Sequence, residues 1–204
     1  MSEILEVHPE TPQPRVIQRA VQVLKAGGVI VYPTDTVYGL GCDATLSSAV
    51  DKIVRIKGRD PRKPLSFVCS NLSEVSRFAR ISNEGFRIMR RCLPGPYTFV
   101  LRGTAEVPRW LKSKQKTVGI RIPNHPVPLA LAGALGSPIV STSANRSGDD
   151  VLTDPLEVKA RFGQEVDLIL DCGILPVLPS TVVSLVDEAP EILRQGAGPV
   201  DFLG

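Results

Sequence analysis

The sequence predicts an α/β fold in which a large twisted mixed β-sheet is flanked by helices. Helical and strand-like hydrophobic periods alternate along the chain, and the strand-like runs outnumber the helical ones. This excess of strands favours a mixed sheet over a strictly repeating βαβ fold. The length of 204 residues, with 43% hydrophobic and 22% charged residues, is typical of one globular domain, which we expect to span residues 1–204.

The individual elements follow from the spacing of apolar residues. The first helix is expected over residues 14–26, where Gly27 and Gly28 end it; its apolar face carries Val16, Ile17, Ala20, Val21, Val23 and Leu24. Further helices are predicted near 47–56 and at 71–80, 83–92, 126–135 and 154–162. Strands are predicted at 29–33, 64–69, 97–102, 117–122, 138–142, 167–171, 181–186 and 191–194.

Several classes of protein are disfavoured by composition. The N-terminal segment contains acidic residues and lacks an apolar stretch, so it does not resemble a signal peptide. The longest nearly apolar stretch, residues 127–136, is too short to cross a bilayer. We therefore expect a cytoplasmic protein that does not bind membranes. The net charge of +3 is too small to indicate nucleic-acid binding by itself.

The four cysteines indicate buried thiols and no metal site. They lie at positions 42, 69, 92 and 172, without a C-x-x-C pair, and the chain has only two histidines to complete a ligand set. Free cysteines are usually buried, so we expect reduced and mostly buried thiols.

A cluster of six basic residues lies between positions 52 and 63, where Asp60 is the one acid. Lys52 and Arg55 are expected on the solvated face of a helix. The loop beyond it is predicted to hold Lys57, Gly58, Arg59, Arg62 and Lys63. A loop with four cations repels itself unless an anion neutralises it, and phosphate suits guanidinium and ammonium groups. The alternative is a basic surface loop, and in either case Lys57→Ala and Arg59→Ala are expected to leave folding intact.

Polar residues also follow several predicted strands. The run from Ser141 to Gly148, Ser-Thr-Ser-Ala-Asn-Arg-Ser-Gly, comes after an apolar strand. Its hydroxyl and amide groups suit phosphate or ribose oxygens, although a serine-rich turn is the alternative. Further polar strand ends lie at Gly119–Arg121, Pro179–Thr181 and Arg194.

The stretch YPTDTVYGLG at positions 32–41 raises the possibility of dinucleotide binding, because Gly39, Gly41 and Ala44 match G-x-G-x-x-A. That fingerprint needs its first glycine in a tight turn at the strand end and an acid at the end of the next strand. Here residues 34–38 intervene, and the next strand ends without an acid. A dinucleotide site is therefore disfavoured, and no P-loop, G-x-S-x-G or H-E-x-x-H motif is present.

Seven motifs taken together resemble the YrdC-like threonylcarbamoyl-adenylate synthases. The motifs occur in the same order as in the family. The resemblance covers roughly residues 15–198, which we take as the core of the domain. The motifs are PTDTVYGLGC at 33–42, Lys57-Gly-Arg59 with Lys63-Pro-Leu, Pro94-Gly-Pro-Tyr-Thr98, Gly119-Ile-Arg-Ile-Pro123, Ser141-Thr-Ser-Ala-Asn145 with Ser147-Gly148, Pro179-Ser-Thr-Val-Val183 and Leu193-Arg-x-Gly196.

The resemblance implies a nucleotidyltransferase that converts L-threonine, bicarbonate and ATP into threonylcarbamoyl-adenylate and pyrophosphate, with Mg²⁺ bound to ATP. A transferase complex would then pass the threonylcarbamoyl group to an adenosine of tRNA. The threonine carbamate is already an anion, so its attack on the α-phosphate needs positioning and charge neutralisation more than a strong base. The bridging of phosphates by Mg²⁺ would require few protein carboxylates.

The family's site residues carry over to matching positions. The resemblance implies catalytic roles for Lys57, Arg59, Ser143 and Asn145. ATP would be bound by Arg59, Lys63, Thr117, Ser143, Asn145 and Arg194. Threonine would be bound by Thr36, Arg121, Ser141 and Ser180, with Arg121 pairing with the substrate carboxylate. Asp35 is interpreted as a turn-forming or network residue in preference to a base.

The sequence also departs from the family pattern. Longer relatives carry a histidine of the threonine pocket where this chain has Val68, and they have an additional C-terminal domain, so we expect a short single-domain form. The segment VHPETPQPR resembles a paralogous YciO-like group. Two alternatives therefore accompany the synthase: a YciO-like paralogue that mainly binds double-stranded RNA or tRNA, and a carbamoyl-adenylating enzyme.

Overall fold

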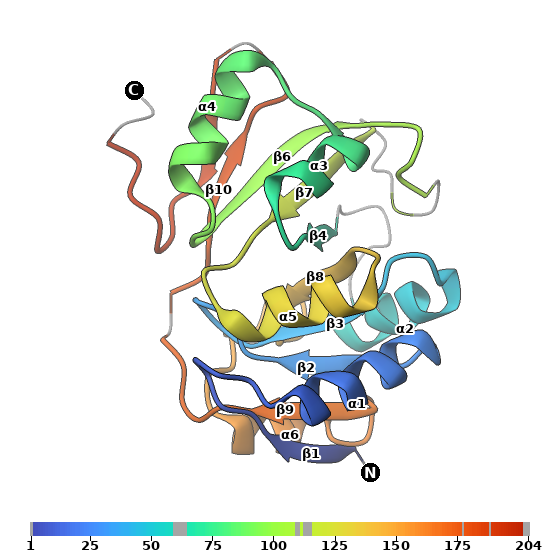
Figure 1. The fold of residues 1–204 in the computed structure, drawn as a ribbon. Coiled ribbons are helices and arrows are strands. Elements are labelled where there is room, and N and C mark those ends of the chain that lie inside the picture. Colours follow the sequence, from blue (N-terminus) through green and yellow to red (C-terminus); the bar gives the residue numbers. More distant parts are fainter. Residues whose placement is uncertain are drawn as a thin grey trace.

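An 11-stranded mixed sheet forms the centre of the molecule in the computed structural model (Figure 1). The structure describes residues 2–58, 65–108, 111, 116–176, 178–187 and 189–201. The strand order is β1-β9-β2-β3-β8-β4-β7-β6-β10-β11, and β5 pairs with β6. The strands are β1 (Glu3–Glu6), β2 (Ile30–Tyr32), β3 (Gly39–Asp43), β4 (Ser66–Val68), β5 (Ala79–Arg80), β6 (Tyr97–Gly103), β7 (Thr117–Arg121), β8 (Ile139–Ser143), β9 (Leu168–Asp171), β10 (Thr181–Ser184) and β11 (Glu191–Arg194).

Six helices border the sheet in the described part of the chain, and their ends match local sequence signals. Asn71, Ser82 and Asp154 each accept a backbone N–H of the first helical turn that follows them. Gly58 and Gly136 end their helices in the left-handed conformation. The helices are α1 (Pro14–Lys25), α2 (Ser47–Lys57), α3 (Leu72–Phe78), α4 (Asn83–Cys92), α5 (Pro126–Leu135) and α6 (Pro155–Phe162).

Two hydrophobic cores lie on opposite faces of the sheet. Ile30 and Leu168 pack with the apolar residues of α1 and α5. Their strand neighbours Val31 and Ile169 point to the other face and join the core that includes residues of α2, α3, α4 and α6. Figure 1 shows α1 and α5 against β2, β3 and β8, away from β6, β7 and β10. The face that α1 and α5 cover therefore continues without them over the remaining strands.

The predicted fold class is confirmed, and the predicted helices and strands are present with end shifts of a few residues. Three strands were not predicted: β1, β3 and the two-residue β5. Residues 39–43 read GLGCD, and glycine lowers strand propensity, yet all five are buried between β2 and β8. The segment 3–6 pairs in parallel with β9 at the sheet edge, so the N-terminal residues are part of the fold.

The cysteines are free and mostly buried, as the composition predicts. All four cysteines are free; Cys42, Cys69 and Cys92 are buried and Cys172 is half-buried. Burial raises the pKa of the Cys92 thiol to about 11, which keeps it protonated near neutral pH. Within the described ranges, no helix has the length and apolar character needed to span a membrane.

Candidate active site

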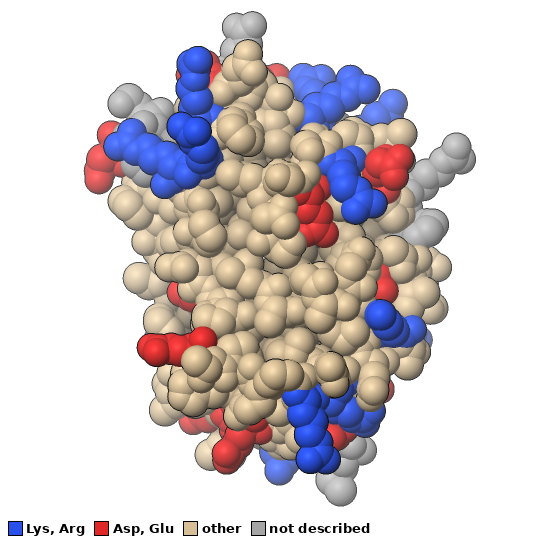
Figure 2. All heavy atoms as spheres, viewed as in Figure 1, with Lys and Arg blue, Asp and Glu red and all other residues tan. Residues whose placement is uncertain are grey.

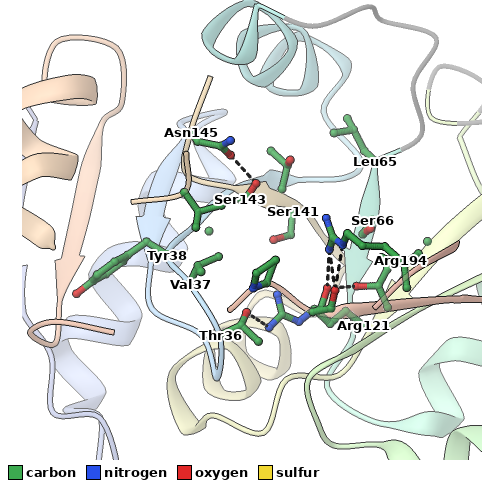
Figure 3. A pocket seen from close by; sticks show the side chains of 18 of the residues that line it. Thr36, Val37, Tyr38, Leu65, Ser66, Arg121, Ser141, Ser143, Asn145 and Arg194 are labelled. Carbon is green, nitrogen blue, oxygen red and sulfur yellow. Dashed lines mark hydrogen bonds between the residues drawn. The ribbon is translucent and has the colours of Figure 1, made fainter. Parts of the chain in front are cut away.

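A cavity of about 450 Å³ lies on the part of the sheet face that α1 and α5 leave uncovered (Figure 3). Its volume is within the range of small-molecule sites. Ser141, Ser66 and Gly119 stand side by side on β8, β4 and β7 and form its floor. A Cβ atom on Gly119 would lie 2.5 Å from Ser66 Oγ, so a larger residue there would displace the Ser66 side chain. The floor is therefore flat and lined with small polar groups.

One end of the cavity is built around Arg121, at the end of β7. Arg121 Nη2 donates to Asp35 Oδ1 at 2.5 Å, Thr36 Oγ1 at 2.7 Å and Thr34 Oγ1 at 3.2 Å. The other carboxylate oxygen of Asp35 accepts from the backbone N–H of Asn124 at 2.9 Å. The segment between β2 and β3 is thereby tied to the segment after β7. Arg121 Nε is buried without a hydrogen-bond partner among the described residues.

A second guanidinium group, that of Arg194 on β11, lies near Arg121. It donates to Ser180 O from Nη2 at 2.8 Å and from Nε at 3.2 Å, and Ser180 Oγ bonds with Thr98 Oγ1 at 2.9 Å. Burial, followed by the charge of Arg121, lowers the pKa of Arg194. Among the described side chains, this end holds the guanidinium groups of Arg121 and Arg194 and one carboxylate, that of Asp35, which pairs with Arg121. The unbalanced positive charge favours binding of a monoanion.

The opposite end of the cavity is built around Asn145, which follows β8. Asn145 Oδ1 accepts from Lys57 Nζ at 2.7 Å and from Ser143 Oγ at 2.6 Å, while its Nδ2 donates to Asp149 O at 2.7 Å. Lys57 Nζ also donates to Ser143 O at 2.8 Å. These bonds join the last residue of α2 to the end of β8. Lys57 therefore connects the Lys57-Gly-Arg59 motif to Ser143 and Asn145 of the Ser141–Asn145 motif.

The position of Lys57 corrects the prediction that it lies in a solvated loop. It is the final residue of α2, and only 4% of its surface is exposed. A buried ammonium group with several hydrogen bonds contributes to stability, because its removal leaves acceptors unpaired. The expectation that Lys57→Ala leaves folding intact therefore loses its premise, and a loss of stability is expected instead.

The structure brings most of the predicted site residues together. Thr36, Arg121, Ser141, Ser143, Asn145, Ser180 and Arg194 all line the cavity. Arg194 lies beside Ser180, at the end predicted for threonine rather than among the predicted ATP residues. Thr117 is buried at the start of β7, on the same face as Gly119, but does not line the cavity. Arg59 and Lys63 lie outside the described residues.

Sequence reasoning missed other residues around the cavity. Thr34, Ser66 and Thr98 were not selected, although strand alternation places Ser66 and Thr98 on the same face as Arg121. Val68 was expected to replace a pocket residue. It is fully buried in the core with α1 and α5 and does not line the cavity.

The side-chain oxygens that line the cavity suit a metal ion whose ligands are mainly phosphate oxygens. Among the described lining residues, the one carboxylate is Asp149, and its Oδ2 already accepts from Arg161 Nη2. The remaining side-chain oxygens are those of hydroxyl groups and Asn145. Mg²⁺ commonly takes few protein ligands and retains water and substrate phosphates. The residues present are therefore compatible with Mg²⁺ that arrives with a nucleotide.

Replacing Asp35 by asparagine is expected to lower the free energy of unfolding by about 3 kcal/mol, because the Arg121 guanidinium loses its buried counter-charge. Both side chains of this pair are about a tenth exposed, at 11% and 9%. Asp187→Asn is the matched control, since Asp187 is 82% exposed and 3.4 Å from Arg102. Urea unfolding followed by circular dichroism measures both variants; equal losses would contradict the structural role assigned to the Asp35–Arg121 pair.

Comparison with known sequences places these features in a family context. The family model described as telomere recombination, which covers Sua5, YciO and YrdC, matches residues 22–196. The YciO protein of Escherichia coli K12, which is described as uncharacterized, is 43% identical over 202 residues, or 98% of each chain. A threonylcarbamoyl-AMP synthase of Halorhodospira halophila is 34% identical over 79% of this chain and 85% of its own length.

Comparison with solved structures gives the same grouping. The crystal structure of E. coli YciO matches with a TM-score of 0.96 over all of both chains at 42% identity. P. abyssi Sua5, solved in complex with L-threonine, matches with a TM-score of 0.93 at 32% identity. That match covers 98% of this chain and 59% of the Sua5 chain. Both relatives therefore share the fold, and Sua5 has substantial additional sequence.

Proposed function

The chain belongs to the Sua5/YciO/YrdC family, and on this basis we propose that it is an L-threonylcarbamoyladenylate synthase. In this reaction ATP, L-threonine and bicarbonate give threonylcarbamoyl-AMP and pyrophosphate, which makes the protein a nucleotidyltransferase. The relatives named threonylcarbamoyl-AMP synthase and the Sua5 complex with L-threonine support this class of activity. YciO is described as uncharacterized, so the similarity to it does not specify the activity, which the experiment below tests.

The observation that carries the proposal is the pair of guanidinium groups, Arg121 and Arg194, that line one end of the cavity, where Asp35 is the one carboxylate paired with them among the described residues. This end therefore carries positive charge that suits an anionic group. The carboxylate of an amino acid has two oxygens that accept hydrogen bonds from a guanidinium group, and it carries one negative charge. Thr36, Ser141 and Ser180 surround this position with hydroxyl groups. This end of the cavity is therefore assigned to L-threonine.

The proposed chemistry divides the cavity into two parts. Bicarbonate and the amino group of threonine give a carbamate and water at the Arg121 end. A carbamate oxygen then attacks the α-phosphorus of ATP, and the bond from that phosphorus to the bridging oxygen breaks as pyrophosphate leaves. The Lys57, Ser143 and Asn145 group at the other end would orient the phosphates. Mg²⁺ would enter with ATP and neutralise phosphate charge.

The product would serve tRNA modification in the cytoplasm through a separate threonylcarbamoyl-transferase complex. A mixed anhydride of this kind is reactive, so it suits a role as an activated donor. In the proposed enzyme, the cavity supplies positioning and positive charge, and the carbamate, which is already an anion, needs no general base for its attack on the α-phosphorus.

Pyrophosphate release is the measurement that tests the proposed function. The protein is incubated with ATP, Mg²⁺ and bicarbonate, with or without L-threonine, and pyrophosphate is quantified. Release that depends on L-threonine is expected. Release that depends instead on carbamoyl phosphate would identify a carbamoyl-adenylating enzyme, and no release with any of these substrates would contradict both activities.

RNA binding is a second candidate function. Figure 2 shows basic side chains gathered over α4, where Arg87, Arg90 and Arg91 are exposed. Acidic side chains are interspersed with the basic ones on the visible face. Contacts with phosphates through these arginines would give salt-sensitive and sequence-independent affinity. A gel-shift titration with double-stranded RNA at two salt concentrations tests this candidate separately from catalysis.

A further inference from the structure

The side chain of Tyr32 lies beside the cavity, on the same face of the sheet as Ser141. Tyr32 is the last residue of β2 and is fully buried. Its ring lies against the glycines of β3: a Cβ atom would come within 2.6 Å of Tyr32 Cε1 at Gly41 and 3.2 Å of Tyr32 Cζ at Gly39. The two glycines that resemble a dinucleotide fingerprint therefore make room for an aromatic ring. The ring in turn places its hydroxyl group at β8.

The Tyr32 hydroxyl donates a hydrogen bond to Ser141 Oγ at 2.5 Å. Ser141 is its one hydrogen-bond partner in the described part of the chain. Burial raises the pKa of Tyr32 to about 12, so the phenol is protonated across the neutral range. If the direction were reversed, the buried phenol proton would have no acceptor, which is unfavourable. Tyr32 is therefore the donor and Ser141 the acceptor.

This direction determines what Ser141 can offer to a ligand. A serine hydroxyl has one proton and two lone pairs, and here one lone pair is occupied by Tyr32. The proton has no acceptor among the described residues, and Ser141 points into the cavity (Figure 3). Arg121, whose guanidinium group only donates hydrogen bonds, lines the same cavity. A ligand held by both must present acceptor oxygens.

We propose that Tyr32 is a positioning residue that fixes Ser141 as a hydrogen-bond donor to a carboxylate oxygen of the substrate. This inference rests on the proposed function, in which the carboxylate belongs to L-threonine. A carboxylate accepts hydrogen bonds only, and it also neutralises the excess positive charge of this end. Tyr32 touches no substrate in this arrangement and acts through Ser141.

Tyr32→Phe and Tyr38→Phe form a matched pair that tests the inference. Both tyrosines are fully buried. The Tyr38 ring points away from the cavity, and its hydroxyl donates to Gly173 O at 2.7 Å (Figure 3). Calorimetric titration should show a Kd for L-threonine raised about fivefold in Tyr32→Phe, in line with the loss of one oriented hydrogen bond. The Kd for Mg-ATP should stay unchanged, and Tyr38→Phe should bind both ligands as the wild type does.

Two further measurements distinguish an effect of Tyr32 on the orientation of the Ser141 hydroxyl from an effect of Tyr32 on packing. Ser141→Ala should weaken L-threonine binding, and adding Tyr32→Phe to it should cause no further loss, because Tyr32 acts only through Ser141. L-2-Aminobutyrate keeps the carboxylate and lacks the side-chain hydroxyl of threonine. Tyr32→Phe should weaken its binding by the same factor as for L-threonine.

Several results would overturn the inference. These are an unchanged Kd for L-threonine in Tyr32→Phe, equal losses in Tyr32→Phe and Tyr38→Phe, or additive losses with Ser141→Ala. Unchanged binding of L-2-aminobutyrate by Tyr32→Phe would assign Ser141 to the threonine hydroxyl and overturn the carboxylate assignment. Wild-type protein that binds no L-threonine would instead overturn the proposed function, and this inference with it.

Discussion

Replacing Lys57 by alanine is expected to lower the free energy of unfolding by about 3 kcal/mol and the rate of pyrophosphate release by about two orders of magnitude. The ammonium group is buried and donates to Ser143 O and Asn145 Oδ1. Its loss removes a positive charge near the proposed phosphate position. It also leaves a carbonyl and an amide oxygen without one of their donors, so stability and activity should fall together.

Lys25→Ala is the matched control for Lys57→Ala. Lys25 is likewise the last residue of a helix, but it is exposed to solvent. Both lysines interact with the dipole of their helix, so the difference between the variants reports the buried contacts of Lys57. Lys25→Ala should change the unfolding free energy by less than about 0.5 kcal/mol. Urea unfolding and the pyrophosphate assay measure both effects; a fully stable Lys57→Ala would contradict the buried network.

Replacing Arg121 by alanine is expected to raise the Kd for L-threonine about 100-fold, because a charge-assisted contact to the carboxylate is lost. The change also leaves Asp35 as a buried carboxylate without its ion pair. The remaining charges at this end, those of Asp35 and Arg194, no longer favour an anion. The Kd for Mg-ATP should change much less, since the proposed phosphate position lies at the Asn145 end.

Two variants control for the charge and the fold in the Arg121 experiment. Arg102→Ala removes an arginine of the neighbouring strand β6 whose side chain is 62% exposed, and it should bind L-threonine normally. Arg121→Lys keeps the charge but loses the planar donor group, so an intermediate Kd is expected. Calorimetric titration with L-threonine measures all three. An Arg121→Ala protein with wild-type affinity would refute the assignment of this end of the cavity.

Much of the fold could be predicted because its helices and most of its strands have a clear hydrophobic period. The face of α1 carries Ile17, Ala20, Val21 and Leu24 at helical spacing, and these residues are buried as expected. The strand β3 could not be predicted in this way. Its glycines lack the usual strand signal, and their role depends on the ring of Tyr32, which belongs to another strand.

The composition of the candidate site was more predictable than its connections. The resemblance to the family's motifs identified Thr36, Arg121, Ser143 and Asn145, which all line one cavity. The burial of Lys57 was not apparent, because a basic run gives no indication of which cation turns inward. The pairing of Arg121 with Asp35 likewise joins segments 86 residues apart, and only the register of the sheet brings them together.

The central claim is that the cavity joins L-threonine, bicarbonate and the adenylyl group of ATP. The most direct measurement uses ¹³C-bicarbonate with ATP, Mg²⁺ and L-threonine, followed by mass spectrometry of the nucleotide products. We expect a threonylcarbamoyl-AMP that carries one ¹³C atom, formed by the wild-type and Arg102→Ala proteins and strongly reduced in Arg121→Ala. A wild-type protein that binds L-threonine and Mg-ATP but forms no labelled adenylate would show that the cavity does not join these substrates.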